Sequence, residues 1–113
     1  MILANGEEIK LTYNLAALVD IENEFDGITD IGEVLSNSKH ILRDTLSLIR
    51  IGVNATIRRE NELKGENRPL FTNAKLASLI DTNQLGELRN LIAEAFSAST
   101  EQVFETEDTS KNT

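Results

Sequence analysis

The segment from Lys39 to Asn61 constrains the fold more than any other part of the sequence. At about 100° per residue, its apolar and small residues cover more than half of the circumference of a helix. A helix of this kind is covered on several sides, so we expect it at the centre of the fold. The residues of this stripe are Ile41, Leu42, Thr45, Leu46, Leu48, Ile49, Gly52, Val53, Ala55, Thr56 and Ile57.

Gly52 lies inside this predicted helix, where glycine costs about 1 kcal/mol relative to alanine. Close approach of another backbone would account for a glycine at this position. Ser38 is a candidate N-cap for the same helix, because a serine oxygen can accept a hydrogen bond from a free N–H of the first turn.

Capping residues predict two shorter helices before the long one. Asn14 can cap a helix from Leu15 to Phe25, and Gly27 can end it. Asp30, with Glu33 three residues later, has the spacing of a capping box for a helix from Ile31 to about Asn37.

Two further helices are predicted after a polar loop from Asn61 to Phe71, which Pro69 keeps out of helix. Thr72 can cap a short helix that carries Leu76, Leu79 and Ile80. Asp81-Thr82-Asn83 then breaks the chain and caps a last helix to about Ala98. Its apolar residues follow helical spacing: Leu85, Leu88, Leu91, Ile92, Ala95 and Phe96.

The N-terminal residues predict a small β element. Asn5-Gly6 favours a tight turn, and Ile9 and Leu11 alternate with polar residues in the second arm. We therefore expect a mainly α (α+β) fold, with a short N-terminal β-hairpin packed on a compact bundle of about five helices. Residues 1–98 would form this single domain, and residues 99–113 a disordered acidic tail.

Composition narrows the class of protein. The net charge is -8, which disfavours nucleic acid as a partner. The chain has no cysteine, so disulfides, cysteine metal sites and thiol nucleophiles are excluded. No apolar run approaches the ~20 residues of a membrane span, and we expect a cytoplasmic protein that does not bind membranes. We expect no cofactor.

Carboxylates near the end of the first helix have the spacing of a calcium loop. Glu22, Glu24, Asp26, Gly27 and Glu33 fall at positions 1, 3, 5, 6 and 12 of an EF-hand. Position 1 is normally Asp, and the predicted helix runs through the start of the loop, so we expect no metal site. On the predicted helix from Leu15 to Phe25, Glu22 lies between Leu15 and Leu18, in the middle of the apolar stripe of that helix. We therefore expect it to be buried and hydrogen-bonded in a structural role, with a partner contact as the alternative.

The long helix carries one polar stripe, which is either a docking face for an acidic segment or a solvated face paired with nearby carboxylates. Its residues are Arg43, Ser47, Arg50, Asn54 and Arg58. His40 is the only histidine, and we interpret it as a surface residue. No nucleophile or phosphate-loop motif is present, so we expect no enzymatic activity.

One set of residues, spread over about residues 1–98, forms an apolar pattern together with Glu22 and Gly27. These residues are Glu8 to Asn14, Ala17-Leu18, Ile21-Glu22, Gly27, Val34-Leu35, Thr72, Leu88, Leu91, Ile92, Ala95 and Phe96. This pattern and the order of the predicted elements resemble the phage tail assembly chaperones, in particular the gene transfer agent tail chaperone-like group. The charged segment from Asn61 to Arg68 departs from the family pattern.

The resemblance implies a protein that binds the tape-measure protein of a phage tail, keeps it soluble, and helps tube subunits assemble around it. It implies a location in the host cytoplasm and absence from the mature virion. The tail tube protein and a second copy of the chain are further candidate partners. Alternatives are a small acidic interaction or regulatory module and a head–tail adaptor. Candidate partner-binding residues are Arg43, Arg50, Arg58, Leu88, Phe96 and Phe104.

Overall fold

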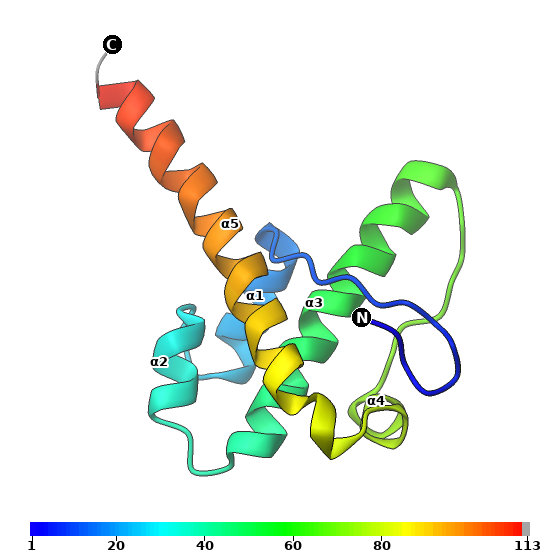
Figure 1. The fold of residues 1–113 in the computed structure, drawn as a ribbon. Helices are drawn as coiled ribbons and strands as arrows, with labels where there is room; N and C mark the ends of the chain where they lie inside the picture. The colour runs from blue at the N-terminus through cyan, green and yellow to red at the C-terminus, as the bar shows by residue number, and fades with distance from the viewer. Residues whose placement is uncertain (112–113) are drawn as a thin grey trace.

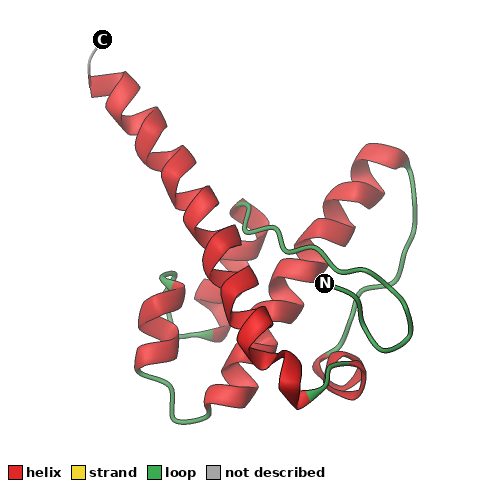
Figure 2. Ribbon diagram, in the orientation of Figure 1, coloured by secondary structure: helices red, strands yellow, loops and turns green. Residues whose placement is uncertain are grey.

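The computed structural model describes the backbone of residues 1–111 and the side chains of residues 1–99. These residues form five α-helices and one turn of 3₁₀ helix (Figures 1 and 2). No helix within this described part is long and apolar enough to cross a membrane. The elements are α1 (Leu15–Glu24), α2 (Ile31–Ser36), α3 (Ile41–Lys64), α4 (Asn73–Leu79), η1 (Thr82–Gln84) and α5 (Leu85–Lys111).

Helix α3 is the centre of the bundle, as its wide apolar stripe predicts. It contacts α1, α2, α4 and α5, and Leu48 and Ile49 are almost completely buried. The helical bundle of the predicted fold class is therefore confirmed. The other large side chains with less than 2 % exposure come from four elements: Ile21, Ile51, Leu76, Leu88 and Ile92, together with Thr45.

Three of the predicted N-caps are confirmed. The side chain of Asn14 accepts a hydrogen bond from Ala17 N at 3.1 Å. Asp30 accepts from Glu33 N at 2.8 Å, and the Thr72 hydroxyl accepts from Lys75 N at 3.1 Å. Each cap satisfies a backbone N–H that has no partner within its helix, so the starts of α1, α2 and α4 follow from local sequence.

Ser38 is not the N-cap of α3. The helix begins two residues later than this cap requires, with His40 at the cap position and no side-chain cap. The Ser38 hydroxyl instead donates to Asp44 Oδ2 at 2.6 Å and accepts from His40 N at 3.1 Å. Ser38 thus organises the turn before α3, while Asp44 in the first helical turn holds it in place.

The predicted β-hairpin is wrong, because residues 1–111 contain no strand. A single antiparallel bridge joins Ile2 and Glu8, around a turn in which Gly6 N donates to Leu3 O at 2.9 Å. Ile9 N still donates to Met1 O at 2.8 Å, but the second arm then leaves this pairing, and Thr12 N donates to Gly52 O on α3 at 3.1 Å. A pairing this short is not stable in water, and contacts with the helices replace it.

The N-terminal segment, residues 8–13, lies across α3 at Gly52 (Figure 1). A Cβ atom on Gly52 would lie 3.1 Å from Tyr13 Cζ and 3.2 Å from Leu11 Cβ. These are side-chain atoms, and the backbone approach expected at this glycine is confirmed by the bond from Thr12 N to Gly52 O at 3.1 Å. The Thr56 hydroxyl, one turn further along α3, donates to Lys10 O at 2.7 Å and fixes the same segment.

Glu22 is exposed, which contradicts its predicted burial. The buried side of α1 is centred on Ala17 and Ile21, whereas Leu15 is 77 % exposed. The Leu15 edge of the predicted stripe therefore points outward and Glu22 points with it, whereas Leu18 is half-buried and packs against the core. Gly27 follows the helix with a φ of 87°, and its N–H donates to Glu22 O at 2.9 Å, so its role in ending α1 is confirmed.

Helix α5 continues to Lys111, past the end near Ala98 that the sequence predicts, and extends away from the other helices (Figure 1). The last described side-chain contact joins the Ser99 hydroxyl to Tyr13 O at 2.7 Å. Most of the predicted tail, residues 99–113, lies outside the residues whose side chains are described. Its disorder in solution stays a prediction.

Candidate functional site

Three hollows border α5, each between this helix and a different neighbour. The first, which we call the α2–α5 groove, has a volume of 420 Å³. The second lies between the N-terminal segment and α5, measures 590 Å³, and is called the N-terminal groove. The third, the α4 cavity, measures 140 Å³ and lies between α3, α4 and the start of α5. Helix α5 therefore offers binding surface along both flanks of its first half.

The α2–α5 groove is lined mainly by apolar side chains. Ile31 and Leu35 of α2 face Ile92 and Phe96 of α5. The Phe96 ring meets the buried Tyr13 ring edge to face, with 6.2 Å between the ring centroids. Tyr13 is itself fixed by a hydrogen bond from its hydroxyl to Leu48 O at 2.9 Å. The wall that Phe96 provides is therefore anchored in the core, and the predicted partner residue Phe96 does line a groove.

The N-terminal groove combines apolar and charged groups. Met1, Ile9 and Leu11 line one side, and Leu91 and Ala95 line the α5 side. Its charged lining comes from Glu8, Lys10 and Glu94. This groove suits an amphipathic segment better than a purely apolar one, because charged groups at its rim stay in water.

Leu88 differs from the other predicted partner residues because it is completely buried, with 0 % exposure. It lines the α4 cavity from the side of α5, where it belongs to the core. Leu42, on the α3 side of the same cavity, is 60 % exposed. A partner at this cavity would therefore touch Leu42, which the sequence interpretation placed in the apolar stripe of the long helix and not among the partner residues.

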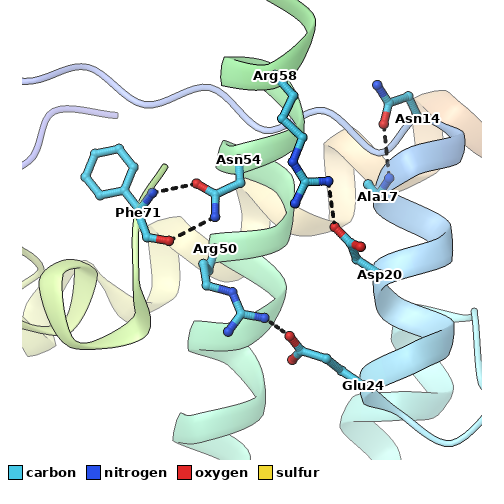
Figure 3. Close-up of polar contacts among 8 residues, drawn as sticks. All are labelled: Asn14, Ala17, Asp20, Glu24, Arg50, Asn54, Arg58 and Phe71. Carbon is cyan, nitrogen blue, oxygen red and sulfur yellow. Dashed lines mark hydrogen bonds and ion pairs between the residues drawn. The ribbon is translucent and has the colours of Figure 1, made fainter. Parts of the chain in front are cut away.

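The arginines of the α3 polar stripe are paired within the molecule. Arg50 pairs with Glu24, and Arg58 with Asp20 at 3.1 Å, so both reach α1 (Figure 3). Arg43 pairs with its neighbour Asp44 at 3.1 Å. Burial lowers the pKa of Arg50, and the nearby charge of Asp20 partly opposes this shift. The interpretation as a stripe paired with nearby carboxylates is confirmed for these three arginines, while a docking role for them stays untested.

The same stripe contains a buried amide that the sequence interpretation placed in solvent. Asn54 Nδ2 donates to Phe71 O at 2.9 Å, and Phe71 N donates to Asn54 Oδ1 at 2.8 Å (Figure 3). Asn61, about two helical turns later, makes the same pair of bonds with Arg68 N and Arg68 O, both at 3.1 Å. These two asparagines fix the loop that returns from α3 to α4. Their spacing on one helix face is a signal that was available in the sequence.

Large apolar side chains are also exposed away from α5. Leu15 and Val19 project from the outer side of α1 with exposures of 77 % and 45 %, and Leu63 projects from the end of α3 with 78 %. Leu15 and Val19 lie one turn apart and form a small apolar patch beside the exposed Glu22. Partner binding would therefore not be limited to the grooves along α5.

The described side chains bear on the predicted calcium loop and on His40. No three of their histidine, aspartate and glutamate side chains come together in a way that could hold a metal ion. His40 is exposed at the start of α3, as its interpretation as a surface residue predicts. Helix α1 includes Glu22 and Glu24, where a calcium loop would have to be unwound.

The predicted partner residue Phe104 lies outside the residues whose side chains are described. No protein-family description, no curated protein and no solved structure matches this chain.

Proposed function

We propose that this protein is a phage tail assembly chaperone that binds the tape-measure protein, keeps it soluble and assists assembly of the tail tube. The observation that carries the proposal is the pair of grooves that follow α5, one on each flank. The order of helices and the resemblance of residues 1–98 to that family support it. In this proposal the protein acts by binding and not as an enzyme, in the host cytoplasm, and is absent from the finished virion.

The mechanism we propose is shielding of apolar helical segments in the client. An amphipathic helix can place its apolar side chains in a groove such as that between Ile31, Leu35 and Phe96. The net charge of -8 then keeps the complex in solution and opposes self-association. Several shallow grooves favour repeated weak contacts, which the tube protein can displace as the tail grows.

Two other functions use the same surfaces. A small regulatory module would bind one folded partner, and a head–tail adaptor would remain in the virion. A tape-measure gene beside the gene for this chain favours the chaperone over the regulatory module. Presence of the chain in purified virions favours the adaptor.

The test is co-expression of this chain with its candidate tape-measure protein. We expect the client to move from the insoluble to the soluble fraction and to co-purify with the chain. A client that stays insoluble, together with normal tail formation after deletion of the gene, would rule out the chaperone function.

A groove variant and a matched control sharpen this test. Ala93 is exposed and lines the α2–α5 groove, so Ala93→Glu places a carboxylate there without disturbing the core. Ala98 is also exposed on α5 but does not line the groove, so Ala98→Glu is the control. We expect only Ala93→Glu to reduce the amount of co-purified client. Equal retention of the client by both variants would show that this groove is not its binding surface.

A further inference from the structure

The turn at Asn5-Gly6 carries a reactive pair of residues that the proposed function does not use. Asn5 and Gly6 are both exposed, and no other asparagine in the chain is followed by glycine. The backbone nitrogen of the residue after an asparagine can attack the side-chain amide carbon of that asparagine. Glycine hinders this attack least, because it has no Cβ beside the attacking nitrogen. The pair is therefore a candidate site of covalent modification.

Contacts with Glu7 hold the Asn5 amide in one orientation. Glu7 N donates to Asn5 Oδ1 at 3.1 Å, and Asn5 Nδ2 donates to Glu7 Oε1 at 3.1 Å. A backbone N–H can only donate, so the amide oxygen must face it. Attack at the amide carbon places negative charge on this oxygen, and a donor that already points at it stabilises the charge as it develops. The turn therefore supplies one of the groups that the reaction needs.

The attacking nitrogen is held by one hydrogen bond. Gly6 N donates to Leu3 O at 2.9 Å, and this bond has to open before the nitrogen can attack. The residues of the turn from Ala4 to Glu7 are all exposed, so water can replace Leu3 O as the partner. Exposed turns open locally at low free energy. The bond therefore slows the reaction without preventing it.

We propose that Asn5 is a site of spontaneous deamidation, which converts it to aspartate or isoaspartate. Gly6 N forms a bond to Asn5 Cγ, the bond from Cγ to Nδ2 breaks, and Nδ2 leaves as ammonia with the proton that Gly6 N gives up. One water molecule then opens the cyclic imide. Opening at Cγ gives aspartate, and opening at the main-chain carbonyl carbon gives isoaspartate. This site does not depend on the proposed chaperone function.

Isoaspartate would change the turn, because it adds one CH2 group to the backbone between Asn5 Cα and Gly6 N. The turn is joined to α4 by the bond from Ala4 N to Leu79 O at 3.0 Å, which depends on the length of the turn. Ile9, which follows the turn, lines the N-terminal groove. We therefore expect isoaspartate to release the turn from α4 and to loosen one wall of that groove.

The test is incubation of the full chain in mildly alkaline buffer, followed by mass spectrometry of tryptic peptides. Residues 1–10 form one such peptide, with Asn5 as its only asparagine. We expect its mass to rise by the exchange of an amide NH2 for OH, and we expect a protein isoaspartyl methyltransferase to label the product. Asn23 is the internal control, because it is exposed but lies in helix α1 before Glu24, and it should convert later.

Two outcomes of this incubation would overturn the proposal. One is an Asn5 that stays intact in the full chain while the isolated peptide of residues 1–10 is completely converted. The other is conversion of Asn23 before Asn5.

Two variants at Glu7 test the role of its backbone N–H. Glu7→Pro removes this donor and leaves Asn5 and Gly6 in place, so conversion should become slower. Glu7→Ala is the matched control, because it removes the carboxylate and keeps the N–H, and it should convert faster than Glu7→Pro. Conversion of Glu7→Pro at the rate of Glu7→Ala or above it would overturn the role of this N–H.

Asn5→Asp separates the added charge from the added CH2 group. It supplies the carboxylate on a backbone of normal length and keeps an oxygen that accepts from Glu7 N. Hydrogen exchange of the Ala4 amide reports the bond to Leu79 O. We expect loss of protection at Ala4 in the isoaspartyl chain and retained protection in Asn5→Asp. Equal protection of Ala4 in the isoaspartyl and natural chains would overturn the release of the turn.

Discussion

Two non-helical segments lie along α3, and they are held in opposite ways. The N-terminal segment bonds to the backbone carbonyl of Gly52 on α3 and to the hydroxyl of Thr56. The loop between α3 and α4 is held by side-chain amides, since Asn54 and Asn61 each bond to both the N–H and the C=O of one loop residue.

The two segments show two ways to supply hydrogen-bond partners for irregular backbone that packs on a helix. Irregular chain that packs on a helix has backbone N–H and C=O groups that need partners. An asparagine side chain supplies one donor and one acceptor at once, so it fixes both groups of a residue and the register of the loop. A glycine supplies no side-chain partner but lets the segment come close enough to bond to the helix backbone. The first solution depends on the asparagine side chain alone, whereas the second depends on close approach at Gly52, with one further bond from the Thr56 hydroxyl.

The largest effect is expected where the amide is buried. Asn54→Ala would remove both bonds to the buried Phe71 backbone and lower the free energy of unfolding by about 2–4 kcal/mol. Denaturant unfolding measures this change. Asn61→Ala is the matched control, because its equivalent bonds to Arg68 are exposed, and it should cost about 1 kcal/mol or less. Equal losses of unfolding free energy in the two variants would show that burial does not increase the contribution of the Asn54 bonds to stability.

The glycine contact is tested by Gly52→Ala. Alanine favours the helix by about 1 kcal/mol, but its Cβ would crowd Tyr13 and Leu11. Overpacking costs about 1–3 kcal/mol, so after the helix gain we expect the free energy of unfolding to fall by up to about 2 kcal/mol in denaturant unfolding. Gly86→Ala on α5 meets nothing within 4 Å and should stabilise by up to about 1 kcal/mol. A stabilised Gly52→Ala protein would mean that the N-terminal segment moves away from the added Cβ at little cost in free energy.

The end of the N-terminal segment should respond to alkaline pH. Burial raises the pKa of Tyr13 above its usual value of 10.0, so the unfolded chain loses the phenol proton at lower pH than the folded protein. The stabilising contribution is complete below pH 10.0 and decreases as the pH rises above it. Tyr13 is the only tyrosine, so tyrosinate absorbance should appear together with loss of helical signal.

Tyr13→Phe is the control for this pH dependence. It should cost about 1 kcal/mol at neutral pH, because it removes the hydrogen bond to Leu48 O. It should also weaken the alkaline loss of stability. Tyrosinate that forms in the natural protein near pH 10.0 without unfolding would contradict the burial of this side chain.

The smallest effect is expected at the ion pair between Arg58 on α3 and Asp20 on α1. Both side chains are partly exposed, with 45 % and 31 % exposure. A double-mutant cycle with Arg58→Ala and Asp20→Ala should therefore give a coupling energy of about 0.2–1 kcal/mol that decreases in high salt. Arg59→Ala, at the exposed neighbouring position, should show no coupling to Asp20. A salt-independent coupling energy as large as the loss in Asn54→Ala would contradict the prediction that the buried amide contributes more to stability than this ion pair.

The candidate site was predictable only in part. Helical spacing identified α5 and placed Phe96 on it, and Phe96 does line the α2–α5 groove. The same spacing made Leu88 an equal candidate for partner binding, yet Leu88 is completely buried. Spacing shows that two residues share a helix, but the neighbouring helices determine which of them remains at the surface. Both Leu42 and Thr45 belong to the predicted apolar stripe of α3. The exposure of Leu42 and the unpaired hydroxyl of Thr45 were found only in the structure.

The sequence by itself determined the starts of α1, α2 and α4, because a cap at Asn14, Asp30 or Thr72 bonds to an N–H only three residues away. It also determined that α3 is central, since its apolar stripe is too wide for one covered side. Tertiary structure alone decided which side of α1 is buried, where Leu15 and Glu22 point outward. It also replaced the hairpin by contacts with α3 and buried Asn54 against Phe71. Those outcomes depend on groups far apart in the chain, and local spacing carries no information about which of them meet.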